Sequence, residues 1–134
     1  MNEFNDGDFR EVAPDALRGH VALKGFFCIC TEWRCSDEEA ALLLGGVSSE
    51  TLSRFHTLPY EELEDETLER ISLLLGIYKA LRALYPTAER ANRRIRLPTD
   101  DRPFNGQSGF EFMSEGSVEH LRQVRRYFDA LKSL

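Results

Sequence analysis

Apolar residues recur three and four positions apart along most of the chain, the spacing that gathers them on one face of an α-helix. The longest example runs through Leu68, Ile71, Leu75, Tyr78 and Leu81. No segment alternates apolar and polar residues over the length of a half-buried strand. The pattern therefore predicts an all-α protein, with helices near residues 14–33, 36–44, 48–58, 65–85, 87–97 and 117–131.

Residues that begin and end helices stand at the predicted boundaries. Ser36 with Glu39, and Ser108 with Glu111, have the spacing of a capping box, in which each side chain bonds the other residue's backbone N–H. The second of these predicts a short helical turn after Ser108. The Gly45-Gly46 pair ends the helix before it, because glycine adopts turn conformations freely.

The length of 134 residues suits one compact unit or two small, closely packed ones. We divide the chain into an N-terminal region, residues 1–62, and a C-terminal region, residues 63–134, that begins with the long central helix. The formal charge of −6 argues against a protein that coats nucleic acid by bulk charge. Residues 1–60 carry five basic and ten acidic side chains, whereas residues 87–134 carry nine basic and seven acidic ones. The two regions are therefore expected to face different partners, the alternative being random asymmetry of a solvated surface.

Targeting signals and membrane spans are not expected. No apolar stretch approaches the roughly twenty residues that cross a bilayer. Residues Met1–Asp6 are polar and acidic, unlike a signal peptide. Three cysteines, Cys28, Cys30 and Cys35, make an odd number and fit a reducing cytosol. We therefore expect a cytoplasmic protein with no membrane contact.

Residues 36–58 have the pattern of a helix-turn-helix motif. Such a motif needs a small residue in its first helix, a glycine at the turn and an apolar residue after it, here Ala40 or Ala41, Gly45 and Val47. Leu52 and Phe55 would anchor the second helix. The side chains left outward for DNA are Ser48, Ser49, Glu50, Thr51, Ser53 and Arg54. The alternative is a plain helical hairpin, because the second glycine makes the turn one residue longer than usual.

Three stretches of the chain carry a resemblance to one family: Leu43–Leu52, Leu68–Leu81 and the C-terminal pattern with Pro98, Phe104-Asn105-Gly106, Gly116-Ser117-Val118 and Arg125-Arg126-Tyr127-Phe128. Together they resemble the Xre/MbcA/ParS-type antitoxins of bacterial type II toxin–antitoxin systems. The resemblance covers roughly residues 30–131. It implies an N-terminal helix-turn-helix that binds the operon's promoter. It also implies a small helical C-terminal domain that blocks the active site of a RES-domain toxin, which consumes NAD. The family tends to carry a tryptophan where Arg94 stands.

The C-terminal region is expected to present apolar anchors and a charged rim to that toxin. Phe104, Phe110 and the last turn, whose terminal carboxylate could mimic a phosphate, would fill or occlude the NAD pocket. The expected contact residues are Arg94, Phe104, Asn105, Gly106, Phe110, Arg125, Leu131, Lys132, Ser133 and Leu134, with Arg96, Arg102, Arg122 and Arg126 nearby. The competing hypothesis places Phe104 and Phe110 in the domain's own core and leaves the tail disordered.

The long central helix carries more apolar surface than one small domain readily covers. We therefore expect a homodimer or larger assembly through a stripe that is partly shared with the intrachain core: Leu68, Ile71, Leu75, Tyr78 and Leu81. The alternative is a core helix used entirely within one chain.

The sequence contains no constellation that indicates catalysis, a metal or a cofactor. His20, Cys28, Cys30 and Cys35 lack the spacing of a zinc site, and His56 and His120 have no partner at catalytic spacing. The expected function is therefore that of a non-catalytic antitoxin that also represses its own operon. The alternative is a stand-alone helix-turn-helix regulator without a toxin partner.

Overall fold

The computed structural model describes residues 12–134, so the acidic stretch Met1–Asp6 lies outside the described residues. Within the described part the chain forms only helices, apart from an isolated bridge between Pro98 and Ser108. The prediction of an all-α protein is confirmed. In chain order the helices are α2 (Pro14–Glu32), α3 (Asp37–Leu43), α4 (Ser49–His56), α5 (Asp65–Leu84), α6 (Ala88–Arg94), α7 (Gly109–Met113) and α8 (Val118–Lys132).

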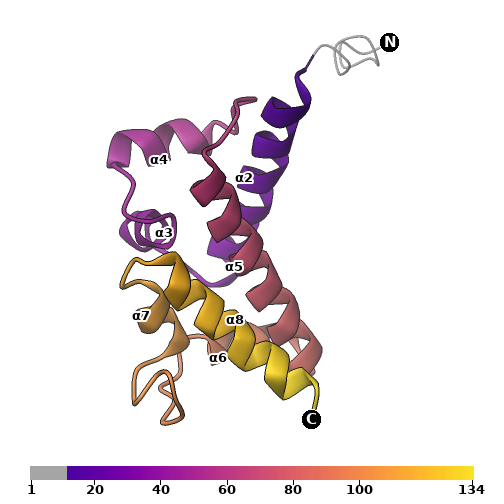
Figure 1. The fold of residues 1–134 in the computed structure, drawn as a ribbon, viewed down its shortest axis with the longest axis vertical. Coiled ribbons are helices and arrows are strands. Elements are labelled where there is room, and N and C mark those ends of the chain that lie inside the picture. The colour runs from indigo at the N-terminus through magenta and orange to yellow at the C-terminus, as the bar shows by residue number, and fades with distance from the viewer. Residues whose placement is uncertain (1–11) are drawn as a thin grey trace.

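Helix α5 runs through the middle of the molecule and packs against α2, α6 and α8 (Figure 1). Its residues Leu74 and Ile77 are completely buried. Leu23 and Phe26 of α2 and Leu121 and Val124 of α8 belong to the same core. Burial on two sides explains why α5 is apolar around so much of its circumference.

The predicted caps are formed. Ser36 and Ser108 each make a capping box, and Ser48 and Ser117 each accept a hydrogen bond from a backbone N–H of the following turn. The prediction of a helix over residues 87–97 is wrong at its end, because α6 stops at Arg94. The next backbone bonds are shorter-range turns, from Arg96 N–H and Leu97 N–H to carbonyls three residues back.

Arg96 connects the two halves of the chain. Its guanidinium donates hydrogen bonds to the backbone carbonyls of Trp33 and Arg34 and to both carboxylate oxygens of Glu39. It also lies over the Phe110 ring, 4.1 Å from the centroid. One side chain therefore links the end of α2, the start of α3 and the C-terminal region.

A second arginine, Arg70 of α5, is buried at 3% exposure. It donates to the Glu66 carboxylate and to the Gly116 carbonyl in the turn before α8. A Cβ on Gly45 would lie 2.9 Å from Arg70 Nε, so the turn between α3 and α4 packs directly on this guanidinium. Arg70 thus joins the α3–α4 turn to the α7–α8 turn.

No helix within residues 12–134 is long and apolar enough to cross a membrane.

Candidate functional site

The α3–α4 pair consists of two short helices joined by the predicted glycine turn. Gly45 and Gly46 both adopt positive φ angles, 96° and 85°, which glycine reaches without a Cβ clash. Ala40 is buried, and Leu52 and Phe55 anchor α4 in the core. The result is a short helix, a tight turn and a second short helix on one side of the molecule, with α3 below α4 in the view of Figure 1.

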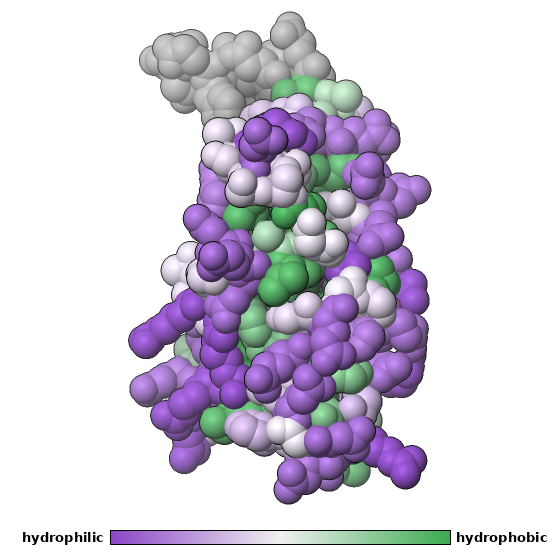
Figure 2. Space-filling view, turned by 90° about the vertical axis from the view of Figure 1, so that its left-hand side faces the viewer, coloured by the Kyte–Doolittle hydropathy of each residue, from purple (hydrophilic) through white to green (hydrophobic). Residues whose placement is uncertain are grey.

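The predicted DNA-binding residues lie together on α4 and its cap. Ser48, Ser49, Glu50, Ser53 and Arg54 are exposed, and Thr51 is half-buried. Figure 2 faces the side that carries α3, α4 and α7, where hydrophilic residues border a broken apolar strip. The Ser48 hydroxyl accepts from the Thr51 backbone N–H and donates to the Thr51 hydroxyl, so Ser48 acts as a helix cap.

The cationic side chains of α4 have acidic partners from neighbouring segments. Arg54 donates from Nε and Nη2 to the two carboxylate oxygens of Glu61, at 3.1 and 3.2 Å. His56 Nε2 lies 3.6 Å from an Asp37 carboxylate oxygen. A phosphate or base would therefore have to compete with Glu61 for Arg54.

The loop between α6 and α7, residues 98–108, closes on itself. Thr99 N–H bonds to the Gln107 carbonyl, and Gly106 N–H bonds to the Thr99 carbonyl. Phe104 points inward at 1% exposure, packed against Phe112 and the Tyr127 ring. Its predicted role as an exposed toxin contact is wrong, because the ring fills the domain's own core.

Phe110 is the second predicted contact that proves to be internal. At 4% exposure it packs edge-to-face on Trp33 and under the Arg96 guanidinium. Its predicted role as a toxin anchor is therefore also wrong. The competing hypothesis for both phenylalanines, burial in the core, is the correct one.

Asn105 and Gly106 form the exposed tip of the loop. Both have positive φ angles, 51° and 100°, so the chain reverses sharply there. Asparagine tolerates this conformation better than most residues. With Phe104 buried beside it, the tip is held in one position and projects at the end of the molecule opposite α4 (Figure 1).

A shallow hollow of about 300 Å³ lies where the loop meets α8. Its lining residues are Arg102, Pro103, Gln123, Arg126 and Tyr127. The Tyr127 hydroxyl donates to an Asp101 carboxylate oxygen at 2.8 Å. Burial and this hydrogen bond raise the pKa of Tyr127, so its hydroxyl remains a proton donor throughout the neutral range. Tyr127 was not among the expected contact residues, although it stands in the Arg125–Phe128 stretch that carries the resemblance.

The predicted arginine contacts are divided among different places. Arg94 is half-buried, with Nε donating to the Tyr85 hydroxyl and the guanidinium over the Phe128 ring. Arg125 points away from the loop and lies across Gly76 of α5. Arg122 bonds to Glu69 of α5, so it too serves the α5–α8 contact.

The C-terminal residues continue the last helix instead of forming a separate tail. Helix α8 ends at Lys132, whose ammonium lies 3.5 Å from Asp129, and the Ser133 hydroxyl bonds to the Asp129 carbonyl. Leu131 is half-buried, and Leu134 is 99% exposed. Lys132, Ser133 and Leu134 thus form an accessible end, close in sequence to the Tyr127 hollow.

The predicted dimer stripe is only partly available. Ile71 and Leu81 are 1% exposed within one chain, so they form the part of the stripe that the intrachain core uses. Leu68, Leu75 and Tyr78 are half-buried and retain some surface. Helices α2 and α8 thus cover the side chains of α5 that point most directly into the core.

Within residues 12–134 no cluster of three or more His, Cys, Asp or Glu side chains could hold a metal ion. Cys28, Cys30 and Cys35 are free thiols. A hydrogen bond between Cys30 and Cys35, together with burial, raises the pKa of Cys30, and the same bond lowers the pKa of Cys35.

No model of a known protein family matches the chain. Among curated proteins, it is 38% identical over 122 residues to the uncharacterized protein y4oB of Sinorhizobium fredii (strain NBRC 101917 / NGR234). The alignment covers 88% of this chain and 89% of that protein. The similarity therefore extends over most of the chain.

Proposed function

The chain belongs to the same family as protein y4oB of Sinorhizobium fredii, and we propose that it is a non-catalytic antitoxin. In this proposal its C-terminal surface binds and blocks a RES-domain, NAD-degrading toxin. Its α3–α4 pair binds the promoter of its own operon, as a homodimer. The resemblance of residues 30–131 to Xre/MbcA/ParS-type antitoxins motivates both parts.

The observation that carries the toxin-binding part is the construction of loop 98–108. Phe104 is locked in the core, and this holds the exposed Asn105-Gly106 tip in a fixed position. A preformed loop loses little conformational entropy on binding. A fold that needed only to connect α6 to α7 would gain nothing from such a projecting tip.

The surface beside the tip has the side chains that contribute most to protein interfaces. Arginine and tyrosine are enriched among the residues that dominate binding energy. Arg126 is well exposed, with its guanidinium 3.8 Å from Glu119, and Tyr127 lines the same hollow. With Phe104 and Phe110 buried, we assign the toxin contact to Arg102, Asn105, Gly106, Arg126, Tyr127, Leu131, Lys132, Ser133 and Leu134.

The test is a growth-rescue assay in which the protein is co-expressed with the RES-domain toxin encoded beside it. Arg102→Glu/Arg126→Glu should abolish rescue and restore NAD loss. The matched control, Arg90→Glu/Arg93→Glu on α6, makes the same charge change and should leave rescue intact. Full rescue by the first variant, folded by circular dichroism, would remove the hollow from the toxin interface.

The promoter-binding part is tested separately. Arg54→Ala/Ser49→Ala should weaken binding to promoter DNA while toxin neutralisation persists, because the two surfaces lie at opposite ends of the molecule. Light scattering at tens of micromolar should report a dimer. Promoter binding without any toxin rescue would instead favour the stand-alone regulator.

A further inference from the structure

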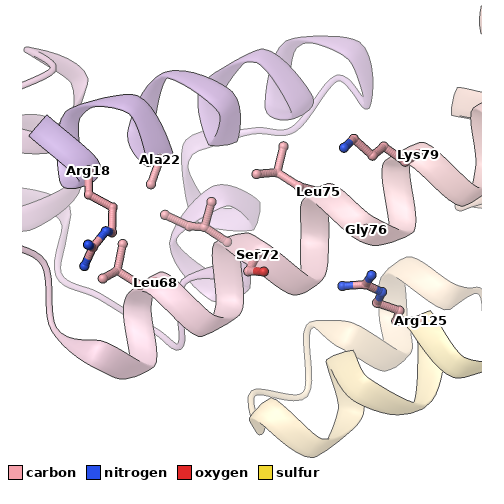
Figure 3. Close-up of a pocket in the computed structure, with 9 residues that line it drawn as sticks. Arg18, Ala22, Leu68, Ser72, Leu75, Gly76, Lys79 and Arg125 are labelled. Carbon is pink, nitrogen blue, oxygen red and sulfur yellow. The ribbon is translucent and has the colours of Figure 1, made fainter.

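A groove of about 460 Å³ lies between α2, α5 and α8 (Figure 3). Its floor is apolar, formed by Ala22 of α2 and by Leu68, Ile71 and Leu75 of α5, with the Ser72 hydroxyl beside them. These half-buried leucines are what remains of the apolar stripe on α5 after α2 and α8 have packed against it.

Three cations from three different helices border this floor. In Figure 3, Arg18 of α2 lies at the end near Leu68, while Lys79 of α5 and Arg125 of α8 lie towards the other end. At 1.5 Å per residue, the stretch of α5 from Leu68 to Lys79 measures about 16 Å. The groove therefore has positive charge at both ends and an apolar centre.

Two of these cations already pair with carboxylates of this chain, and both pairs are weak. Arg18 pairs with Asp15 at 3.1 Å and Arg125 with Asp129 at 3.3 Å, both along the surface of their own helices. Exposed pairs of this kind contribute about 0.3–0.5 kcal/mol, so an incoming carboxylate can replace them. Within residues 12–134 no carboxylate lies at ion-pair distance from Lys79. The described residues therefore leave the Lys79 ammonium available to an incoming carboxylate.

Gly76 determines the position of Arg125. A Cβ at this position would overlap the Arg125 guanidinium, so only glycine lets that side chain lie flat across α5. Glycine inside a helix costs roughly 0.5–1 kcal/mol relative to alanine. Glycine at position 76 thus lowers the stability of α5 slightly but leaves room for the Arg125 guanidinium at the edge of the groove.

We propose that this groove docks an acidic peptide segment of a partner protein, with apolar side chains in the centre and carboxylates towards both ends. The protein as a whole carries −6 and repels acidic partners, so three cations around an apolar floor form a local exception. An amphipathic segment in a groove is a common recognition mode. Nucleic acid fits less well, because its backbone is charged throughout and offers no anchor for the leucine floor. The proposal is independent of the toxin-binding hollow, which uses none of these residues.

The test is fluorescence anisotropy with the full chain and a labelled helical peptide of roughly 14 residues, built from glutamate and leucine with leucines at i, i+3, i+4 and i+7. We expect a Kd below about 100 µM near physiological salt. Arg18→Glu/Lys79→Glu/Arg125→Glu should weaken binding at least about tenfold, and this variant should instead bind the matching lysine–leucine peptide.

The control variant is Lys24→Glu/Arg34→Glu/Arg90→Glu, which changes the net charge equally outside the groove and should alter the affinity less than about threefold. Gly76→Ala keeps every charge but displaces Arg125, and it should weaken binding by a few-fold while the protein stays folded.

Equal losses in the two triple variants would overturn the proposal. So would a single-stranded oligonucleotide of the same charge binding as tightly as the peptide. A third result would also overturn it: the wild-type protein is a dimer that does not bind the peptide, and the groove variant is a monomer. A second copy of the chain would then occupy the groove.

Discussion

Arg54 and Glu61 form a two-bonded ion pair that joins the outward face of α4 to the segment before α5. Arg54 is the residue best suited to read a base or hold a phosphate in the proposed promoter complex. The pair is half-exposed, so its own contribution to stability is small. Its main effect is therefore that Glu61 competes for Arg54 with any negatively charged ligand that approaches α4.

The first prediction concerns this pair. Glu61→Gln removes the competing charge, and promoter DNA should bind a few-fold more tightly, whereas Arg54→Ala should weaken binding by roughly 1–3 kcal/mol if the arginine reads a base. Anisotropy titrations with labelled promoter DNA measure both. Glu62→Gln removes the same charge from the adjacent position and controls for the general reduction in repulsion. Equal gains in the two glutamine variants would show that Glu61 has no specific hold on Arg54.

The second prediction separates folding from recognition in loop 98–108. Phe104→Ala should destabilise the protein by about 3–5 kcal/mol, because it empties a buried site among Phe112, Tyr127 and Phe128. Asn105→Gly keeps the left-handed backbone and should leave the free energy of unfolding almost unchanged. Chemical denaturation gives both values. A loss below about 1 kcal/mol for Phe104→Ala would mean that the ring is not a core residue.

The third prediction compares two glycines of α2. A Cβ on Gly19 would overlap the Glu61 carbonyl oxygen, which is backbone and cannot move freely, whereas a Cβ on Gly25 would meet the Leu75 side chain at 3.3 Å. Gly19→Ala should therefore destabilise by more than about 2 kcal/mol, and Gly25→Ala should fall within about 1 kcal/mol of the wild type. Thermal unfolding checks the order of the two variants. The reverse order would contradict the close approach of α2 to the segment before α5.

The fourth prediction concerns pH. Hydrogen bonds from the Arg96 guanidinium lower the pKa of the Glu39 carboxyl below its usual range. The stabilisation from this pair is therefore complete above the unfolded-state pKa of about 4.3 and is lost as the pH falls through the lower folded-state value.

Glu39→Gln keeps an acceptor for the Ser36 backbone N–H but removes the charge. It should cost about 1 kcal/mol at pH 7 and nothing below the folded-state pKa. Urea unfolding of both proteins between about pH 2 and pH 7 tests the difference. A difference that does not change with pH would assign the loss to shape instead of charge. Glu38→Gln, an exposed change in the same helical turn, is the control.

The helices and their boundaries were readable from the sequence because their causes are local. Ser36, Ser48, Ser108 and Ser117 cap the helices that follow them, since each cap involves residues only three positions apart. The same holds for the Gly45-Gly46 turn and for burial of Leu52 and Phe55. The end of α6 was misjudged because residues 95–97 turn tightly towards the loop bridge at Pro98, a contact ten residues away.

The location of the site residues depended on contacts between distant segments, which periodicity does not encode. An aromatic residue in a loop can contact a partner or fill the core of its own domain, and the packing of α7 and α8 against the loop put Phe104 in the core. Arginines are equally ambiguous in sequence. Tertiary packing put Arg96 on the end of α2, buried Arg70 beneath the α3–α4 turn and laid Arg125 over Gly76. The amino-acid pattern thus determined which segments are helical and which faces are apolar. The packing of α2 and α8 against α5 decided which of those faces and charges remain free to bind.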